Sequence, residues 1–426
     1  MKRCLVAAAL TVAALAFVGA PTGAQSGAQT EAALAGAVSV DGGVNFSCAL
    51  LGSGQVRCWG DNAAGQLGND ALGTDSAVPV PVRNVANTGN LAGATQLDVG
   101  TDHACARLSS GQAVCWGEGG ASQLGDGGGL DRDFPVTVRN TANTAALTGI
   151  TQITAGQGHA CARLANGQAR CWGNNSAGQI GNGAAPADAF TAQAVRNAGN
   201  TANLTGVVEI DAGEFHTCAR LNTGQARCWG DSDSGRLGNN AVVVDRDLPV
   251  VVRNTNGAGA LSGVTQLSTG GDHTCARLAN GQARCWGDGV NGELGDGTDI
   301  DSPFPGAVTT PGGDANLAGV TSIHAGDNST CARLGNGQAR CWGDGDAGRL
   351  GNGIVQDSDF PVIVRNLVDS APLRNVVGVI ASMGDHSCAV LSNQQVRCWG
   401  DNDSGQLGND DNPNDSPLPV AVQVSP

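Results

Sequence analysis

The sequence lacks tyrosine entirely, and its only lysine is Lys2. Its 23 Lys and Arg residues stand against 38 Asp and Glu residues, which gives a formal net charge of -15 over 426 residues. Nucleic-acid binding depends on neutralising phosphates with lysine and arginine, and the sequence offers no basic cluster for this purpose. We therefore expect a well-solvated acidic surface and no nucleic-acid partner.

Beyond the N-terminus the sequence also lacks a long hydrophobic run, so we expect no membrane span. The exception is an apolar stretch at residues 5–18, which follows Lys2 and Arg3 and precedes small residues. This order is typical of a secretory signal peptide, whereas the alternative, a membrane anchor, needs a longer stretch. We predict a signal peptide over residues 1–24, a short linker over residues 25–33 and a mature protein that is secreted, periplasmic or held at the cell surface.

Glycine, in contrast, is abundant, but its 66 copies follow no Gly-X-Y period, which excludes a collagen-like chain. The tryptophans mark seven copies of one unit, each with Cys before the Trp and Gly after it. They are Trp59, Trp116, Trp172, Trp229, Trp286, Trp342 and Trp399, in steps of 56 or 57 residues. Self-similarity at a fixed period indicates a repeat architecture, and it covers nearly all of the mature chain.

The fourth unit contains four strand-like segments, at residues 207–212, 216–221, 225–229 and 248–253. They are short, rich in alternating or β-branched residues and separated by turn residues. Pro249 suits an outer strand, where a missing N–H costs least. A four-stranded antiparallel sheet per unit is therefore predicted.

Seven small sheets in series form either an open stack or a closed ring, and neither end of the chain resembles a polar cap. We predict an all-β fold over residues 34–426, a seven-bladed β-propeller of four-stranded antiparallel blades, closed by N- and C-terminal strands. If the last strand of each unit pairs with the next unit, residues 419–424 complete the sheet that residues 36–41 begin. A ring without free edges favours a monomer.

The repeat "GxxHxCxL…G…CWGxxxxGQLG…PVxV" resembles that of the regulator-of-chromosome-condensation family, which consists of seven-bladed propellers. In the fourth unit it is carried by Gly213, His216, Cys218, Leu221, Gly224, Trp229, Gly230, Gly235, Leu237, Gly238 and Pro249. Two features depart from the family pattern. The segment after each "VRN", as at Thr141, is longer than usual, and the paired cysteines are similar to those of exported bacterial members.

Fourteen of the 15 cysteines form seven pairs, each ten positions apart, and we expect Cys4 to be removed with the signal peptide. An even set in an exported chain is typical of a disulfide framework. A three-residue loop centred on Asn166 places Cys161 opposite Cys171, whereas a two-residue Asn-Gly turn places it opposite Trp172. The even count per hairpin favours one local disulfide per blade. The pairs are Cys48 and Cys58, Cys105 and Cys115, Cys161 and Cys171, Cys218 and Cys228, Cys275 and Cys285, Cys331 and Cys341, and Cys388 and Cys398.

A zinc site is the rival interpretation, because a histidine precedes the first cysteine by two residues in five units. The other two units carry Phe46 and Ser329 there but keep both cysteines, so we expect no metal. The histidines more simply make a repeated hydrogen bond inside the ring. They are His103, His159, His216, His273 and His386.

Three loops after Trp-Gly have the Asp-x-Asp-x-Gly spacing, which calcium sites also use. They begin at Asp231, Asp344 and Asp401. None is followed by a bidentate glutamate at the proper distance, so we expect the carboxylates to build turns and no cofactor to be present.

No phosphate-binding glycine loop or nucleophile elbow is present, so we predict that the protein is not an enzyme. A catalytic site would be unique, whereas the polar residues here repeat. Positions that break the repeat are therefore the better suspects. These are Phe46, Glu118, Glu214, Phe215, Glu293, His324 and the irregular segment at residues 299–317.

The predicted function is an exported, disulfide-stapled scaffold that binds another protein through its variable loops, as an inhibitor or interaction module. One alternative is a cell-surface or matrix component that binds carbohydrate on its tryptophans, but their identical positions are typical of a core. The family resemblance implies a further alternative, guanine-nucleotide exchange on a small GTPase. Predicted export and the absence of a recognisable exchange-loop insertion argue against it.

Overall fold

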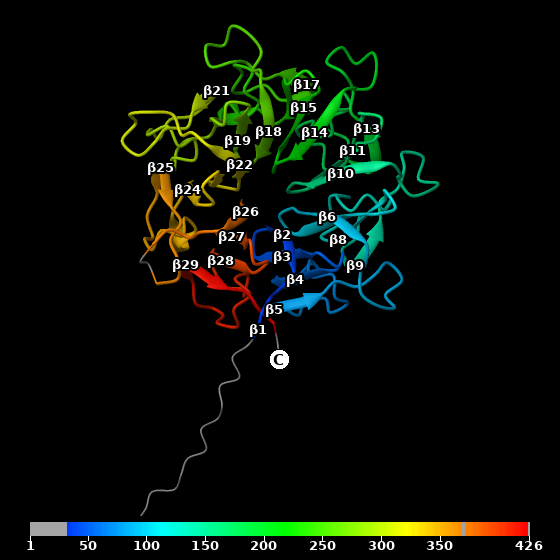
Figure 1. Cartoon of the computed structure of the whole chain (residues 1–426). Helices are drawn as coiled ribbons and strands as arrows, with labels where there is room; N and C mark the ends of the chain where they lie inside the picture. Colours follow the sequence, from blue (N-terminus) through cyan, green and yellow to red (C-terminus); the bar gives the residue numbers. More distant parts are fainter. Residues whose placement is uncertain (1–31, 369–370, 425–426) are drawn as a thin grey trace, which may run out of the picture.

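The chain forms a ring of seven four-stranded antiparallel sheets, or blades, around a central channel (Figure 1). This computed structural model describes residues 32–368 and 371–424. The predicted signal peptide and residues 25–31 of the predicted linker lie outside the described residues. The prediction of an all-β, seven-bladed propeller is confirmed. In the described part of the chain, no helix has the length and apolar character that a membrane crossing requires.

Each blade takes four consecutive strands from one unit, ordered from the channel to the rim. The first strands are β2 (Ala37–Gly42), β6 (Ala94–Val99), β10 (Ile150–Ala155), β14 (Val207–Ala212), β18 (Val264–Thr269), β22 (Val320–Ala325) and β26 (Val376–Ala381). The second strands are β3 (Phe46–Leu51), β7 (His103–Leu108), β11 (His159–Leu164), β15 (His216–Leu221), β19 (His273–Leu278), β23 (Ser329–Leu334) and β27 (His386–Leu391).

The outer half of each blade completes the sheet. The third strands are β4 (Val56–Gly60), β8 (Ala113–Gly117), β12 (Ala169–Gly173), β16 (Ala226–Gly230), β20 (Ala283–Gly287), β24 (Ala339–Gly343) and β28 (Val396–Gly400). The fourth strands are β5 (Ser76–Pro81), β9 (Arg132–Thr137), β13 (Ala189–Ala194), β17 (Arg246–Val251), β21 (Ser302–Ala307), β25 (Ser358–Ile363) and β29 (Ser416–Ala421). Two short 3-10 turns, η1 (Asp233–Gly235) and η2 (Asp346–Gly348), follow β16 and β24.

The antiparallel order gives the ring two distinct faces. Loops after the first and third strands of every blade lie on one face, which we call the front face. Loops after the second and fourth strands lie on the other, the back face. Blades are numbered 1 to 7 in chain order.

The hairpin between the second and third strands has the register of the three-residue loop. Cys161 pairs with Cys171 across β11 and β12, and Gly167 has a φ of 74°, the left-handed conformation that this turn needs. All seven cysteine pairs form disulfides, with sulfur atoms 2.06 to 2.09 Å apart. The prediction of one disulfide per blade is therefore confirmed.

Terminal strands close the ring, but not in the way that the sequence suggested. The expectation that residues 419–424 complete the sheet of the first blade is wrong, because β29 pairs with β28 of its own blade. Closure instead uses a separate two-stranded sheet, in which β1 (Ala32–Ala33) pairs with β30 (Gln423–Val424). Each unit already contains four consecutive strands that pair as local hairpins, so no blade has to borrow a strand.

The core lies between neighbouring blades. All seven tryptophans are 0% exposed. Trp286 of blade 5, for example, belongs to one cluster with Leu237 and Val252 of blade 4. A frame of this kind is held by contacts between adjacent units, as in other repeat proteins.

Removing one disulfide should weaken the frame without unfolding it. For Cys161→Ala with Cys171→Ala, closing a loop of this length accounts for a loss of roughly 2–3 kcal/mol in the free energy of unfolding. Denaturant unfolding of the double variant and the wild type, both under oxidising conditions, measures the loss. An unchanged unfolding midpoint would contradict a stabilising role for this disulfide.

Candidate functional site

Each tryptophan fixes the front-face loop of the preceding blade. Its indole Nε1–H donates a hydrogen bond of 2.8 or 2.9 Å to a main-chain oxygen in the loop after the third strand of that blade. In order from Trp59 to Trp399, the accepting residues are Gln406, Gln66, Gln123, Gln179, Arg236, Glu293 and Arg349. The variable front-face loops are therefore held at the same position in all seven blades.

Glycine permits this close contact. Gly238 has a φ of 63°, and a Cβ atom placed on it would lie 2.7 Å from Nε1 of Trp286. Any larger residue at this position would push the loop away from the indole, which explains why every unit has glycine there.

Four of the five repeated histidines make the expected hydrogen bond inside the ring. Nε2 of each lies 2.7 or 2.8 Å from a Thr or Ser hydroxyl of the next blade, for His159, His216, His273 and His386. The hydroxyl of Thr274 in turn donates to the Arg236 oxygen, which also accepts from Trp286. Burial holds the pKa of His216 well below its usual value, so its imidazole is neutral. Its Nε2–H is the donor in the hydrogen bond to Thr274.

Two departures from this pattern are explained by the next blade. The position that offers a hydroxyl elsewhere is Ala104 after Phe46 and Ala160 after His103. Phe46 and Ala104 belong to one apolar cluster, so the phenylalanine serves the core. Within the described residues, neither ring nitrogen of His103 has a hydrogen-bond partner. The cysteines near the histidines are in disulfides, which leaves no thiolate for zinc.

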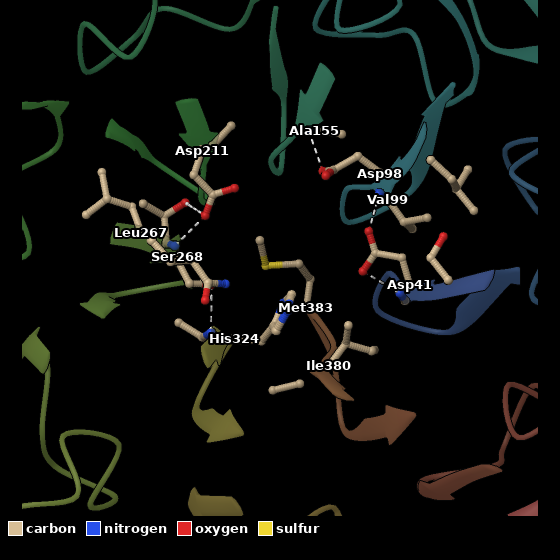
Figure 2. Close-up of a pocket in the computed structure, with 18 of the residues that line it drawn as sticks. Asp41, Asp98, Val99, Ala155, Asp211, Leu267, Ser268, His324, Ile380 and Met383 are labelled. Carbon is tan, nitrogen blue, oxygen red and sulfur yellow. Dashed lines mark hydrogen bonds between the residues drawn. The ribbon is translucent and has the colours of Figure 1, made fainter. Parts of the chain in front are cut away.

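A cavity of about 280 Å³ occupies the channel (Figure 2). The first strands line it, and Asp41, Asp98, Glu209, Asp211 and His324 stand on its wall. Sequence reasoning missed these carboxylates as a group. The available signal was a polar residue at the fifth position of most first strands.

These fifth residues connect neighbouring first strands. In blades 1 to 5 this residue accepts a hydrogen bond from a backbone N–H of the next blade. The contacts are Val99 to Asp41 (2.8 Å), Ala155 to Asp98 (2.9 Å), Ala212 to Thr154 (3.1 Å), Thr269 to Asp211 (2.8 Å) and Ala325 to Ser268 (3.0 Å). This ladder joins blades 1 to 6. Among the described residues, the ladder does not continue from blade 6 to blade 7 or from blade 7 to blade 1. His324 takes the fifth position in blade 6 and Ile380 takes it in blade 7.

The channel changes the acidity of its carboxylates. Burial raises the pKa of Asp41 and of Asp211 to about 7, although backbone N–H groups oppose the shift. Burial, reinforced by the charges of Asp41 and Asp211, also holds the pKa of Asp98 well above its usual value. Burial lowers the pKa of His324 to about 4, so its imidazole is neutral near pH 7.

The front face carries most of the negative charge. Its loops hold 28 of the 38 acidic residues, with five after the first strands and 23 after the third strands. Arginines gather on the back-face loops, at Arg83, Arg139, Arg196, Arg253, Arg365 and Arg374. In the described residues of those loops, Asp314 is the only acid. The ring is therefore polarised along its axis.

The three Asp-x-Asp-x-Gly loops use their first carboxylate to build the turn. Asp231, Asp344 and Asp401 each accept from the N–H two residues later, at 2.7, 2.7 and 3.1 Å. Among the described residues, carboxylate oxygens converge within 4.8 Å in two groups, Asp344 with Asp346 and Asp357, and Asp401 with Asp403 and Asp415. In the first group, Arg349 Nη1 lies 3.3 Å from Asp344, so a guanidinium already compensates part of the charge.

The residues that break the repeat are not brought together. Phe46 lies in blade 1, Glu118 in blade 2, Glu214 and Phe215 in blade 4, Glu293 in blade 5 and His324 in blade 6. Glu293 is buried and accepts hydrogen bonds from the main chain and side chain of Asn291. Burial raises the pKa of Glu293 to about 7. The irregular segment at 299–317 contains β21, an ordinary fourth strand.

Two repeat profiles, both described as regulator of chromosome condensation (RCC1) repeat, match most of the chain. They cover residues 37–66, 150–179, 207–236, 264–293, 320–349 and 382–406, and residues 53–107, 110–163, 224–277 and 280–333. The ultraviolet-B receptor UVR8 of Arabidopsis thaliana is 30% identical over 373 residues, which are 87% of this chain and 78% of that protein. The chain belongs to the RCC1-repeat family.

The chain is also similar to part of a much longer protein and to two solved structures. The human E3 ubiquitin-protein ligase HERC2 is 27% identical over 78% of this chain, but the match spans 6% of HERC2. The fold also matches human WBSCR16 (TM-score 0.70, 20% identity, 87% of this chain and 94% of that one). Prp20p of Saccharomyces cerevisiae has a TM-score of 0.65 at 18% identity, over 91% of this chain and 88% of that one. These relatives are eukaryotic, so the bacterial, exported character expected from the cysteines stays a prediction.

The bridging hydroxyl between blades should be worth measurable stability. Thr274→Val keeps the shape but leaves His216 Nε2–H buried without a partner, which costs about 1–3 kcal/mol in the free energy of unfolding. The matched variant, which should gain a hydrogen bond, is Ala160→Ser. It supplies a hydroxyl to His103, as Ser47 supplies one to His386. Thermal unfolding should give a lower Tm for the first variant and a higher Tm for the second. Changes of the same sign would contradict the bridging role.

The channel carboxylates should contribute less to stability as pH rises. Asp41 and Asp211 keep their protons up to about pH 7, whereas in the unfolded chain they titrate near the ordinary value of 3.8. Each of these two carboxyl groups therefore binds more protons in the folded ring than in the unfolded chain, and its contribution to the free energy of unfolding decreases from about pH 4 to about pH 7. The buried histidines, whose pKa values are lowered by burial, contribute in the opposite direction. Tm measured against pH for the wild type and for a carboxylate variant isolates this contribution.

Asp211→Asn isolates the contribution of one channel carboxylate. The amide keeps an oxygen for Thr269 N–H but cannot ionise, so between about pH 4 and about pH 7 we expect Tm to fall less, or to rise more, than in the wild type. The control is Asp233→Asn on the exposed front face, which should follow the wild-type slope. Equal slopes for all three proteins would contradict the assignment.

Proposed function

We propose that this protein is an exported, disulfide-stapled β-propeller that binds another protein through its variable loops. The observation that supports the proposal is that repeated residues and variable residues occupy different parts of the structure. Residues present in nearly every unit are used in the frame: Trp, Cys and the glycines of the tryptophan-anchored loops. The sequence that differs between units lies mainly in loops on a rigid support, where binding sites are commonly found.

Export is supported by the signal-like N-terminus and by the disulfides. Fourteen cysteines lie in seven pairs within one chain, and disulfides persist in oxidising compartments rather than in the cytosol. We further propose that the ring acts as a monomer and has no catalytic role of its own.

Protein binding is the use of the fold that the relatives support. Prp20p, which has the same fold, binds Gsp1p and histones. The carbohydrate alternative loses its basis here, because all seven tryptophans are buried between blades and none offers a platform to a sugar.

Affinity capture tests the proposal. The mature ring, residues 25–426, is immobilised and exposed to the culture medium and to the cell-wall fraction of its own source. We expect one partner to be retained by the wild type. A variant in which residues 240–244 are replaced by a Gly-Ser segment of equal length serves to locate the site.

The matched control replaces residues 255–259 on the back face in the same way. Loss of the partner from only one of these variants would support binding through loops. Failure of the wild type to retain any partner from either fraction would contradict the proposal.

A further inference from the structure

The front-face loops carry far more negative than positive charge, and just outside them Arg132, the first residue of β9, pairs with Asp126 at 2.9 Å. Among the front-face loops only Arg236 and Arg349 are basic, and these two are 4% and 2% exposed. Each is already paired with a front-face carboxylate at 2.7 Å, Arg236 with Asp272 and Arg349 with Asp385. The solvent-facing side of these loops therefore consists of carboxylates and neutral residues.

Apolar side chains stand exposed among these carboxylates. Fifteen large apolar residues are exposed in the described part of the chain, and nine of them lie in loops after the third strands. Seven of the nine belong to blades 4 to 6, including Val243 (78% exposed), Ile300 (67%), Val290 (62%) and Val355 (59%). We call residues 231–245, 288–301 and 344–357 the blade 4–6 loop face.

A surface that is acidic only for solubility has no need of exposed valine and isoleucine. Scattered apolar residues are ordinary on protein surfaces, but a group of them within one charged region indicates contact with another molecule. These apolar residues are thus an independent sign of a ligand, in addition to the charge.

Crowding of the carboxylates favours a cationic ligand. Glu214 lies in the front-face loop of blade 4, and burial together with Asp327 and Asp272 raises its pKa to about 7. Burial and the charge of Asp272 likewise raise the pKa of Asp327 to about 6. A positive group placed nearby would relieve this repulsion.

We infer that the blade 4–6 loop face binds a cationic, amphipathic segment of a partner protein. Arginine or lysine side chains of that segment meet the carboxylates, while its apolar side chains cover residues such as Val243 and Ile300. A metal ion or a polyamine would satisfy the carboxylates but leave the apolar residues exposed, and nucleic acid is repelled. This inference rests on the proposed function and names the chemistry of its partner.

Titration with designed peptides tests the inference on the mature ring. The probe is an 18-residue amphipathic helix of lysine and leucine, and the comparison is a lysine and glutamine peptide of equal charge. Calorimetry at low and high salt gives the dissociation constants. We expect tighter binding of the lysine and leucine peptide, weakened by salt because ion pairs contribute.

Two variants separate charge from apolar contact. Asp233→Asn with Asp299→Asn and Asp346→Asn removes one exposed carboxylate from each of the three loops. Its control, Asp70→Asn with Asp403→Asn and Asp410→Asn, removes equal charge from blades 1 and 7. Val243→Ser with Ile300→Ser removes two apolar contacts.

The charge variant and the apolar variant should each weaken peptide binding about fivefold to tenfold, and the control less than about twofold. Equal binding of the two peptides, or equal weakening by the charge variant and its control, would overturn the inference. Absence of binding would overturn it as well. A neutral partner captured by the variable loops would then leave the proposed function intact.

Discussion

The hydrogen bond from each tryptophan to the loop of the preceding blade is the contact on which the rest of the ring depends. Trp286 Nε1–H reaches the main-chain oxygen of Arg236, 50 residues earlier, and the same oxygen accepts from Thr274. Gly238 allows the loop to lie against the indole. Because all seven blades repeat this contact, the loops can vary in sequence while their starting points stay fixed.

The seven-bladed frame could be predicted from the sequence because the residues that build it repeat in every unit. Seven tryptophans and seven cysteine pairs defined the blades, and the choice between two turns at Asn166 was resolved by the observed register. The channel ladder was not predicted, because its fifth-position residue varies among Asp, Thr and Ser while doing one task. Closure through Ala32–Ala33 and Gln423–Val424 was missed, although the residues after the fourth strand pair in the same way with those before the next first strand in other blades, as Arg83 does with Asn90.

The candidate binding site was the least predictable part. Acidic residues occur in every unit of the chain, and only the antiparallel order of the strands places 28 of them on one face. Exposure of Val243 or Ile300 likewise depends on how a loop folds back on its neighbours. The sequence could say that function lies in loops, whereas the fold decides which loops share a face and with what charge.

Hydrogen exchange of the Trp286→Phe variant tests most directly whether the tryptophans anchor the binding loops. Phenylalanine keeps much of the buried area but lacks the N–H that holds Arg236. The account predicts faster amide exchange in residues 231–245 of blade 4, with little change in residues 288–301 of blade 5. Faster exchange confined to blade 5, or none in residues 231–245, would contradict it.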